Sequence, residues 1–146
     1  MTKLFIKSPA FDNDKFIPPK FTCDGVNVNP PLAIEGLPKE TKSLALIVDD
    51  PDVIMGTWDH WIVWNIPPKT KIKENSIPGV EGLNDFGKHS YRGPCPPTGV
   101  HRYFFKVYAL DITLFLDPNS KKKDLERAMI NHILASGEII GRYGRG

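Results

Sequence analysis

The sequence has few cysteines, little net charge and no long hydrophobic run. The formal net charge is +2, from 19 basic and 17 acidic residues, far from the dense positive field that nucleic-acid binding usually requires. No stretch is long and apolar enough to span a membrane, and Lys3 and Lys7 interrupt the N-terminal region, where a signal peptide would need an apolar segment. We therefore expect a cytoplasmic protein with no integral membrane segment and no nucleic-acid partner.

The two cysteines, Cys23 and Cys95, lie beside turn-forming residues in the segments TCDG and PCPP. A cytosolic setting favours reduced thiols over a disulfide. A disulfide is sterically feasible if the fold brings the two turns together. The sequence alone does not decide between these alternatives.

Several catalytic signatures are absent from the sequence. There is no GxxxxGK phosphate loop, so nucleotide triphosphate hydrolysis is unsupported. No serine stands in a GxSxG elbow, and no pair of histidines has the HExxH or HxH spacing typical of metal sites. Function must therefore be sought in residues that are distant in sequence.

Proline is abundant, at 14 of 146 residues, which is roughly double the average share of ~5%. The length is that of a single domain, here 1–146, with enough chain to bury one sizeable core. Many short elements joined by stiff turns are expected.

Three apolar runs, rich in branched and aromatic residues, predict buried strands at 43–48, 60–66 and 103–110. No helical pattern lies between them, as a parallel sheet would require, so we expect antiparallel central strands in a sandwich and a mostly β fold. Shorter strands are expected at 4–6, 20–23, 31–37 and 138–143, and a long functional loop at 67–92.

One helix is expected near the C-terminus. Asn119 or Ser120 can cap it, and Gly137 would end it. Its buried face is formed by residues at three- and four-residue spacing, namely Leu125, Ala128, Met129, His132 and Ile133.

Ionisable side chains cluster at the ends of the three central strands. Asp50 and Asp52 follow the first strand and His60 begins the second, so antiparallel pairing would place them on one rim. His101 and Tyr103 begin the third strand, directly after the stretch GPCPPTG, whose prolines restrict the backbone and hold both side chains nearly fixed. The sequence thus predicts a pocket with two walls, one from the first two strands and one from the start of the third strand.

Imidazoles and a tyrosine hydroxyl can donate hydrogen bonds to phosphate or carboxylate oxygens, while aspartates orient the imidazoles. Two alternatives use the same rim. His60, His101 and a carboxylate could hold a divalent metal, or one histidine could act as the general base of a hydrolase. A nucleophilic pair of Cys95 and His101 is a further alternative, and each residue taken alone also fits a structural role.

The segments that carry these residues closely resemble the phosphatidylethanolamine-binding protein family, also called Raf kinase inhibitor-like proteins, in its short prokaryotic form. The resemblance covers nearly the whole chain and rests on these stretches: TCDGVNVNPPLAI, SLALIVDDPD, HWIVWNIP, NDFGKHSYRGPCPPTGVHRYFFKVYALD and LERAMINHILASGEIIGRYGR. It implies a β-sandwich with a large central antiparallel sheet packed on a smaller one.

The resemblance also implies a non-enzymatic protein without cofactor or bound metal, whose pocket takes anionic groups such as phosphate, carboxylates and phospholipid head groups. Inhibition of a kinase or serine protease and formation of a homodimer are further implied expectations. In the loop DPDVIMG, Ile54 stands where family members usually have proline. The family's pocket residues carry onto Asp50, His60, His101 and Tyr103, with Asp52, Trp58, Pro94 and Pro96 as supports.

Overall fold

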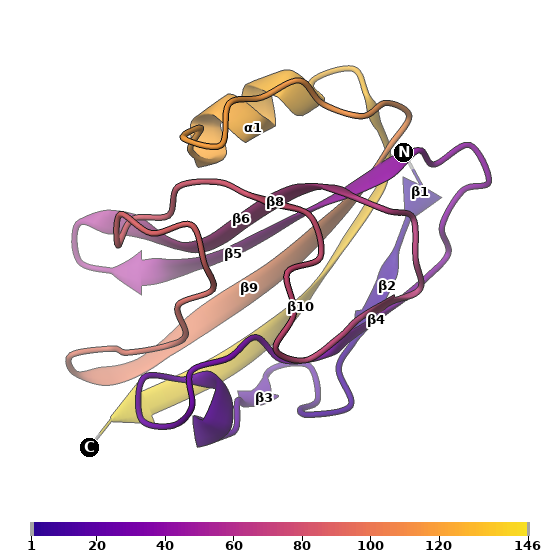
Figure 1. Cartoon of the computed structure of the whole chain (residues 1–146). Helices are drawn as coiled ribbons and strands as arrows, with labels where there is room; N and C mark the ends of the chain where they lie inside the picture. The colour runs from indigo at the N-terminus through magenta and orange to yellow at the C-terminus, as the bar shows by residue number, and fades with distance from the viewer. Residues whose placement is uncertain (1, 146) are drawn as a thin grey trace.

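The computed structural model describes residues 2–145, which form two β-sheets and one α-helix (Figure 1). The first half of the chain contains a short 3-10 helix and six strands: β1 (Thr2–Lys3), β2 (Phe5–Lys7), β3 (Lys15–Phe16), η1 (Pro19–Phe21), β4 (Leu32–Glu35), β5 (Ser43–Val53) and β6 (Gly56–Ile66). The second half contains β7 (Lys71–Ile72), β8 (Val80–Glu81), β9 (Gly99–Leu110), α1 (Lys122–Met129) and β10 (Ile133–Arg145).

The large sheet has seven strands in the order β1-β10-β9-β5-β6-β8, with β3 also paired to β10, and the small sheet has the order β2-β4-β7. Strand β5 pairs antiparallel with both β6 and β9. The expected mostly β sandwich with three antiparallel central strands is therefore confirmed. Within residues 2–145, no helix has the length and apolarity needed to span a bilayer.

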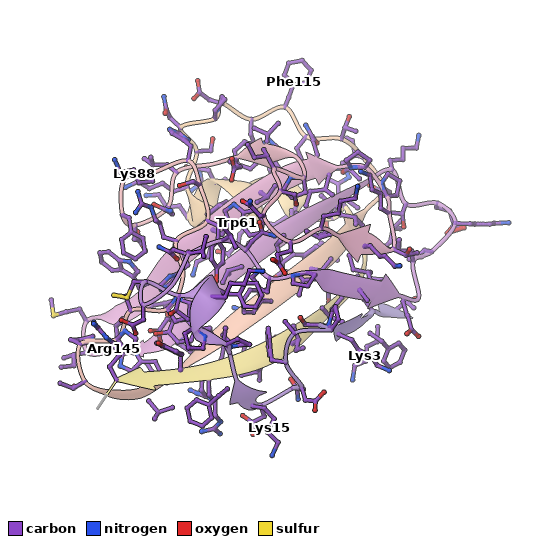
Figure 2. All side chains as sticks on the ribbon, turned by 60° about the horizontal axis from the view of Figure 1, so that its bottom comes forward. Lys3, Lys15, Trp61, Lys88, Phe115 and Arg145 are labelled. Carbon is purple, nitrogen blue, oxygen red and sulfur yellow. A yellow bond between two sulfur atoms is a disulfide. The ribbon has the colours of Figure 1, made fainter. Side chains whose placement is uncertain are left out.

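Both faces of the large sheet are covered, which explains why its central strands are continuously apolar. Alternate side chains of β5, such as Leu46 and Val48, pack toward the small sheet, whereas Ala45 and Ile47 pack under α1 and the segment before it. In Figure 2, Trp61 lies among the strands, whereas Phe115 projects from the outer surface.

The helix is shorter than the sequence predicted. It begins after Lys121, whose backbone N–H donates to the Asp124 carboxylate (2.9 Å), and it ends at Met129. Asn131 adopts the left-handed conformation (φ 68°), and Ile133 already begins β10. The expected helical continuation to Gly137 is wrong because β10 gains a full-length antiparallel partner in β9.

Two smaller expectations also need correction. The segment 20–23 is not a strand, since Pro19–Phe21 forms a 3-10 helix that begins with proline, where the missing N–H is not needed. The long loop 67–92 contains the two-residue strands β7 and β8, each paired to one sheet edge. The central strands are longer than expected, so that β5 and β6 form one hairpin that turns at Ile54 and Met55.

Cys23 and Cys95 form a disulfide, with their Cα atoms 5.5 Å apart, so the expectation of reduced thiols is wrong. The two turns that carry them are packed tightly. A Cβ atom at Gly93 would lie only 2.1 Å from the Phe21 carbonyl oxygen, and the Cys23 N–H donates to the Pro94 carbonyl (3.1 Å). Because Cys95 is oxidised in this bridge, it offers no thiolate for a pair with His101.

Candidate functional site

A cavity of about 200 Å³ lies where β5, β6 and β9 meet the proline-rich loop. The long β5–β6 hairpin pairs Asp50 with Trp58, and β9 lies on the other side of β5. The structure thereby brings together six of the eight side chains singled out in the sequence, which line the cavity: Asp50, Trp58, His60, Pro96, His101 and Tyr103.

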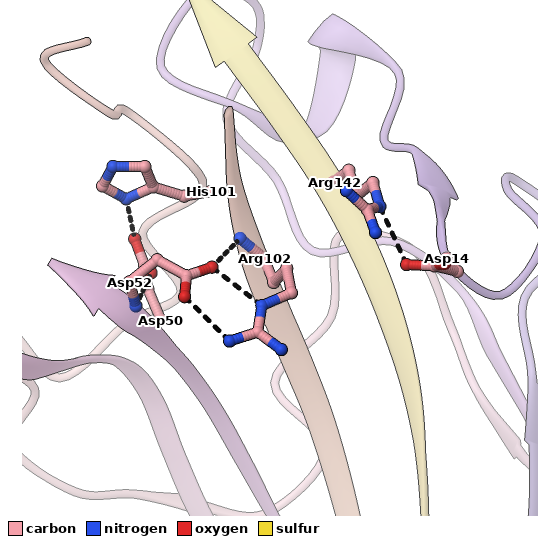
Figure 3. Close-up of polar contacts among 6 residues, drawn as sticks. All are labelled: Asp14, Asp50, Asp52, His101, Arg102 and Arg142. Carbon is pink, nitrogen blue, oxygen red and sulfur yellow. Dashed lines mark hydrogen bonds and ion pairs between the residues drawn. The ribbon is translucent and has the colours of Figure 1, made fainter. Parts of the chain in front are cut away.

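The first fixed ring is His101, whose Nδ1 lies 2.6 Å from Oδ2 of Asp50 (Figure 3). Asp50 is almost fully buried, and its other oxygen accepts the Asp52 backbone N–H (2.8 Å). A carboxylate only accepts hydrogen bonds, so Nδ1 carries the proton and donates. The Nε2 atom of His101, which has no hydrogen-bond partner within residues 2–145, is left available to the cavity.

The second fixed ring is His60, whose Nδ1 lies 2.6 Å from the Arg92 carbonyl oxygen. A carbonyl also only accepts, so this Nδ1 donates and Nε2 is again the remaining nitrogen. Burial lowers the pKa of His60, against the opposing effects of the hydrogen bond and nearby aspartates. The neutral ring therefore presents an Nε2 lone pair, and only the protonated ring presents a second N–H.

Tyr103 stands between the two imidazoles. Its ring makes an edge contact with His60, with 5.3 Å between centroids, and stacks near His101 at 6.5 Å. Burial, the adjacent Asp50 charge and a hydrogen bond to the Asp50 side chain raise the pKa of the Tyr103 phenol, so the phenol stays neutral and its O–H is directed at Asp50. The cavity thus holds one phenol between two oriented imidazoles.

Asp52 and Pro94 do not line the cavity. Asp52 is paired with Arg102, whose Nη2 and Nε donate to Oδ1 and Oδ2 at 2.8 and 2.9 Å (Figure 3). This hydrogen-bonded guanidinium lowers the pKa of the Asp52 carboxyl. Pro94 is buried behind the wall, where its carbonyl accepts the Cys23 N–H. Asp52 therefore ties β5 to β9, and Pro94 ties the proline-rich loop to the turn at Cys23, although neither residue lines the cavity.

Phe86 lines the cavity but was missed in the sequence, as were Val53 and Pro97, and Cys95, considered there only as a nucleophile, lines it as half of the disulfide. Its ring contacts both Trp58 and His60, at centroid distances of 5.6 and 5.2 Å. Buried Asn84 accepts the Phe86 N–H (2.9 Å) and donates to the His60 carbonyl (3.1 Å), which holds the turn against β6. The turn itself is recognisable in NDFGK, but its docking position has no local sequence signal.

The cavity chemistry gives no support to the metal alternative. In the part of the chain that the structure describes, no group of three or more His, Cys, Asp or Glu side chains could hold a metal ion. His60 and His101 each donate Nδ1–H to an acceptor, which suits a metal ligand as well as a hydrogen-bond donor, so what counts against a metal is the lack of a third ligand among the described residues. What remains is a set of hydrogen-bonding groups suited to an oxygen-rich ligand.

Comparison with known proteins places the chain in a family. The model of the family described as phosphatidylethanolamine-binding protein matches residues 7–144. A UPF0098 protein of Pyrococcus horikoshii is 54% identical over 149 residues, covering 94% of this chain and 75% of that protein.

Solved structures agree with that assignment. The crystal structure of a phosphatidylethanolamine-binding protein homologue from Chlamydia trachomatis matches with a TM-score of 0.95 and 41% identity over 100% of both chains. The structure of E. coli YbcL, described as a member of the mammalian PEBP family, matches with a TM-score of 0.91 and 30% identity, covering 99% of this chain and 100% of that one. As its motifs predicted, this chain belongs to the phosphatidylethanolamine-binding protein family, in its short prokaryotic form.

Proposed function

We propose that this chain is a non-enzymatic binding protein whose cavity captures a small anionic group: phosphate, a carboxylate or a phospholipid head group. One observation carries the proposal. His60 and His101 line a single cavity, and each ring is oriented through Nδ1 by a fixed acceptor, which leaves both Nε2 atoms for a ligand. Two such rings match the oxygens of a phosphate or carboxylate.

The charge of the cavity determines how an anion would bind. Asp50 is a buried carboxylate beside the cavity, so the His101 ring that donates to it is needed to limit its repulsion of an anion. His60 tends to be neutral, and its Nε2 can hydrogen-bond an anion's oxygen only by gaining a proton or by accepting one from a protonated ligand. Binding is therefore expected to bring a proton into the cavity.

The mouth of the cavity favours an anion that belongs to a larger molecule. Trp58 and Phe86 are partly exposed and in edge contact beside it, and Ile54 and Met55 are fully exposed at the hairpin tip. A phosphate ester with an apolar body, such as a phospholipid, would cover this surface with its apolar part. Inhibition of a kinase or serine protease would follow from occupation of the same rim, and it rests on family analogy alone.

The enzyme alternative is less well supported by the cavity. The sulfur atom of Cys95 belongs to the Cys23–Cys95 disulfide, so the described lining of the cavity offers no thiolate nucleophile, and the Asp50 carboxylate is already bound by His101 and the Asp52 N–H. We therefore assign to His60 and His101 the role of ligand donors.

The test is a calorimetric titration with inorganic phosphate on the parent protein and on His60→Ala and His101→Ala. Each substitution should abolish measurable heat or weaken affinity by about tenfold or more, since a charged hydrogen bond contributes about 1.5–3 kcal/mol. The matched control is His132→Ala, because His132 also binds an aspartate through Nδ1 but is exposed and lies outside the cavity. Unchanged phosphate affinity in both cavity variants contradicts the proposal.

The sequence's expectations of a cytoplasmic location and a homodimer stay predictions. The disulfide bears on the first of them, since such bonds persist in oxidising compartments and in the cytosol of hyperthermophiles. Size-exclusion chromatography with light scattering tests the second.

A further inference from the structure

A second and larger cavity, of about 390 Å³, lies between the segments 26–29, 75–77 and 90–92. It shares no lining residue with the first cavity. Its lining is predominantly polar and includes one residue of each charge, Arg92 and Glu81.

Arg92 and Glu81 line one cavity without pairing with each other. Across the described part of the chain, the Arg92 guanidinium has no hydrogen-bond or ion-pair partner. Glu81 is held by the buried Trp61, whose indole Nε1–H donates to its Oε2 at 2.8 Å. The indole therefore holds the carboxylate in place, and no ion pair within the described residues joins it to Arg92.

The remaining lining adds a neutral donor and an aliphatic edge. Asn27 accepts the Gly93 N–H through Oδ1 (2.8 Å), which leaves its amide nitrogen as a donor. Val26 and Ile77 are exposed at the edge, although both are aliphatic. A ligand that satisfies all of these groups carries an anionic end, a cationic end and a short aliphatic part.

We propose that this second cavity binds a zwitterionic aliphatic amino acid, with its carboxylate at Arg92, its ammonium at Glu81 and its side chain against Val26 and Ile77. The inference does not rest on the proposed anion capture, which uses other side chains. An unpaired guanidinium and a carboxylate that has one oxygen left over share this cavity, and they recognise opposite ends of such a ligand through charge-assisted hydrogen bonds.

The experiment titrates L-leucine into the isotopically labelled protein and follows the Trp61 indole N–H resonance by NMR. This group is in direct contact with Glu81, so it reports occupation of the cavity. Two half-ligands serve as matched probes: 4-methylpentanoate lacks the ammonium and 3-methylbutylamine lacks the carboxylate. We expect saturable shifts with leucine at about millimolar concentration and affinity at least about tenfold weaker for each half-ligand.

Two variants assign the ends of the ligand. Glu81→Gln should weaken leucine binding by about tenfold or more while leaving 4-methylpentanoate binding unchanged. Arg92→Gln should weaken leucine binding by a similar factor while leaving 3-methylbutylamine binding unchanged. Glu126→Gln and Arg127→Gln, which alter exposed charges of α1, are the matched controls and should bind leucine like the parent.

The result that overturns the inference is also specific. If leucine causes no saturable shift, or if 4-methylpentanoate binds as tightly as leucine, the cavity is not a zwitterion site. His101→Ala should still bind leucine and Glu81→Gln should still bind phosphate. Failure of one site therefore remains distinguishable from failure of the other.

Discussion

Strand β9 has a histidine–aspartate pair at each end, and the two pairs differ mainly in burial. At its start, His101 Nδ1 lies 2.6 Å from Asp50, with the side chains 13% and 3% exposed. Just after its end, Asp111 lies 2.9 Å from His132 Nδ1, with the side chains 42% and 37% exposed. The same chemical pair thus occurs once against a cavity and once in solvent.

Burial changes what such a pair can do. An exposed pair is screened by water and adds little free energy, whereas a buried carboxylate that loses its partner is left without solvation. The buried pair is also rigid, because the Asp50 carboxylate is held by a second hydrogen bond from the Asp52 N–H. A fixed imidazole beside a cavity is suited to ligand recognition, whereas an exposed histidine–aspartate pair adds polar groups that keep the surface soluble.

The largest expected effect comes from the disulfide at the cavity end. Replacing Cys23 and Cys95 with serine should lower the free energy of unfolding by about 4 kcal/mol, because the bridge spans a sequence separation of 72 residues. Urea unfolding measures the loss. Hydrogen exchange should accelerate more near His101 than near Asp111, and equal acceleration at both ends would mean that the bridge does not act locally.

Breaking the two pairs directly is the next test. Asp50→Ala should cost about 2–3 kcal/mol, because it leaves the Asp52 N–H and the His101 ring without their acceptor in a buried site. Asp111→Ala, the matched change at the exposed end, should cost less than about 1 kcal/mol. The measurement is the urea midpoint at constant slope, and similar losses for both variants would refute the role assigned to burial.

Acid sensitivity should also be traced to the cavity end. Burial lowers the folded-state pKa of His60, so below its ordinary value of 6.5 the unfolded chain binds more protons than the folded one. Stability should therefore fall as the pH drops from about 6.5 through the folded pKa, by up to about 1.4 kcal/mol per pH unit. His60→Asn retains a donor for the Arg92 carbonyl but cannot titrate in this range.

The check is the free energy of unfolding of the parent and of His60→Asn, measured from about pH 7.5 to about pH 5. This range begins above the ordinary histidine pKa and extends below it. The variant should show a shallower slope. An identical slope in both proteins would show that His60 does not contribute to the acid sensitivity.

The central strands could be predicted from the sequence because burial on both faces gives uninterrupted apolar runs such as SLALIV. The end of the helix could not be predicted. The spacing from Leu125 to Ile133 fits a continuous helical face, although Ile133 in fact begins β10. Long-range pairing with β9 and the left-handed Asn131 decide between helix and strand. Propensity is a weak prior when a full strand partner is available.

The candidate site was predictable only in part, for a similar reason. Strand-end aspartates and histidines mark the rim, but three aspartates follow one another closely, and the β-bulge between Val48 and Asp49 shifts the register. Asp49 binds Lys106 and Lys122 outside the cavity, Asp50 enters it, and Asp52 pairs with Arg102. Only the tertiary contacts assign these three roles.

The smallest expected effect concerns two exposed apolar residues, one at the β5–β6 hairpin tip and one in the segment before α1. Ile54 at the hairpin tip and Phe115 before α1 are both fully exposed, at 101% and 108%. Ile54→Ser and Phe115→Ser should each change stability by less than about 0.5 kcal/mol, because neither side chain is buried. Only Ile54→Ser should weaken binding of a long-chain alkyl phosphate, by a few-fold, since this tip lies beside the cavity mouth. Inorganic phosphate affinity should be unaffected, and a calorimetric titration that shows equal alkyl phosphate affinity in both variants would remove the apolar tip from the binding surface.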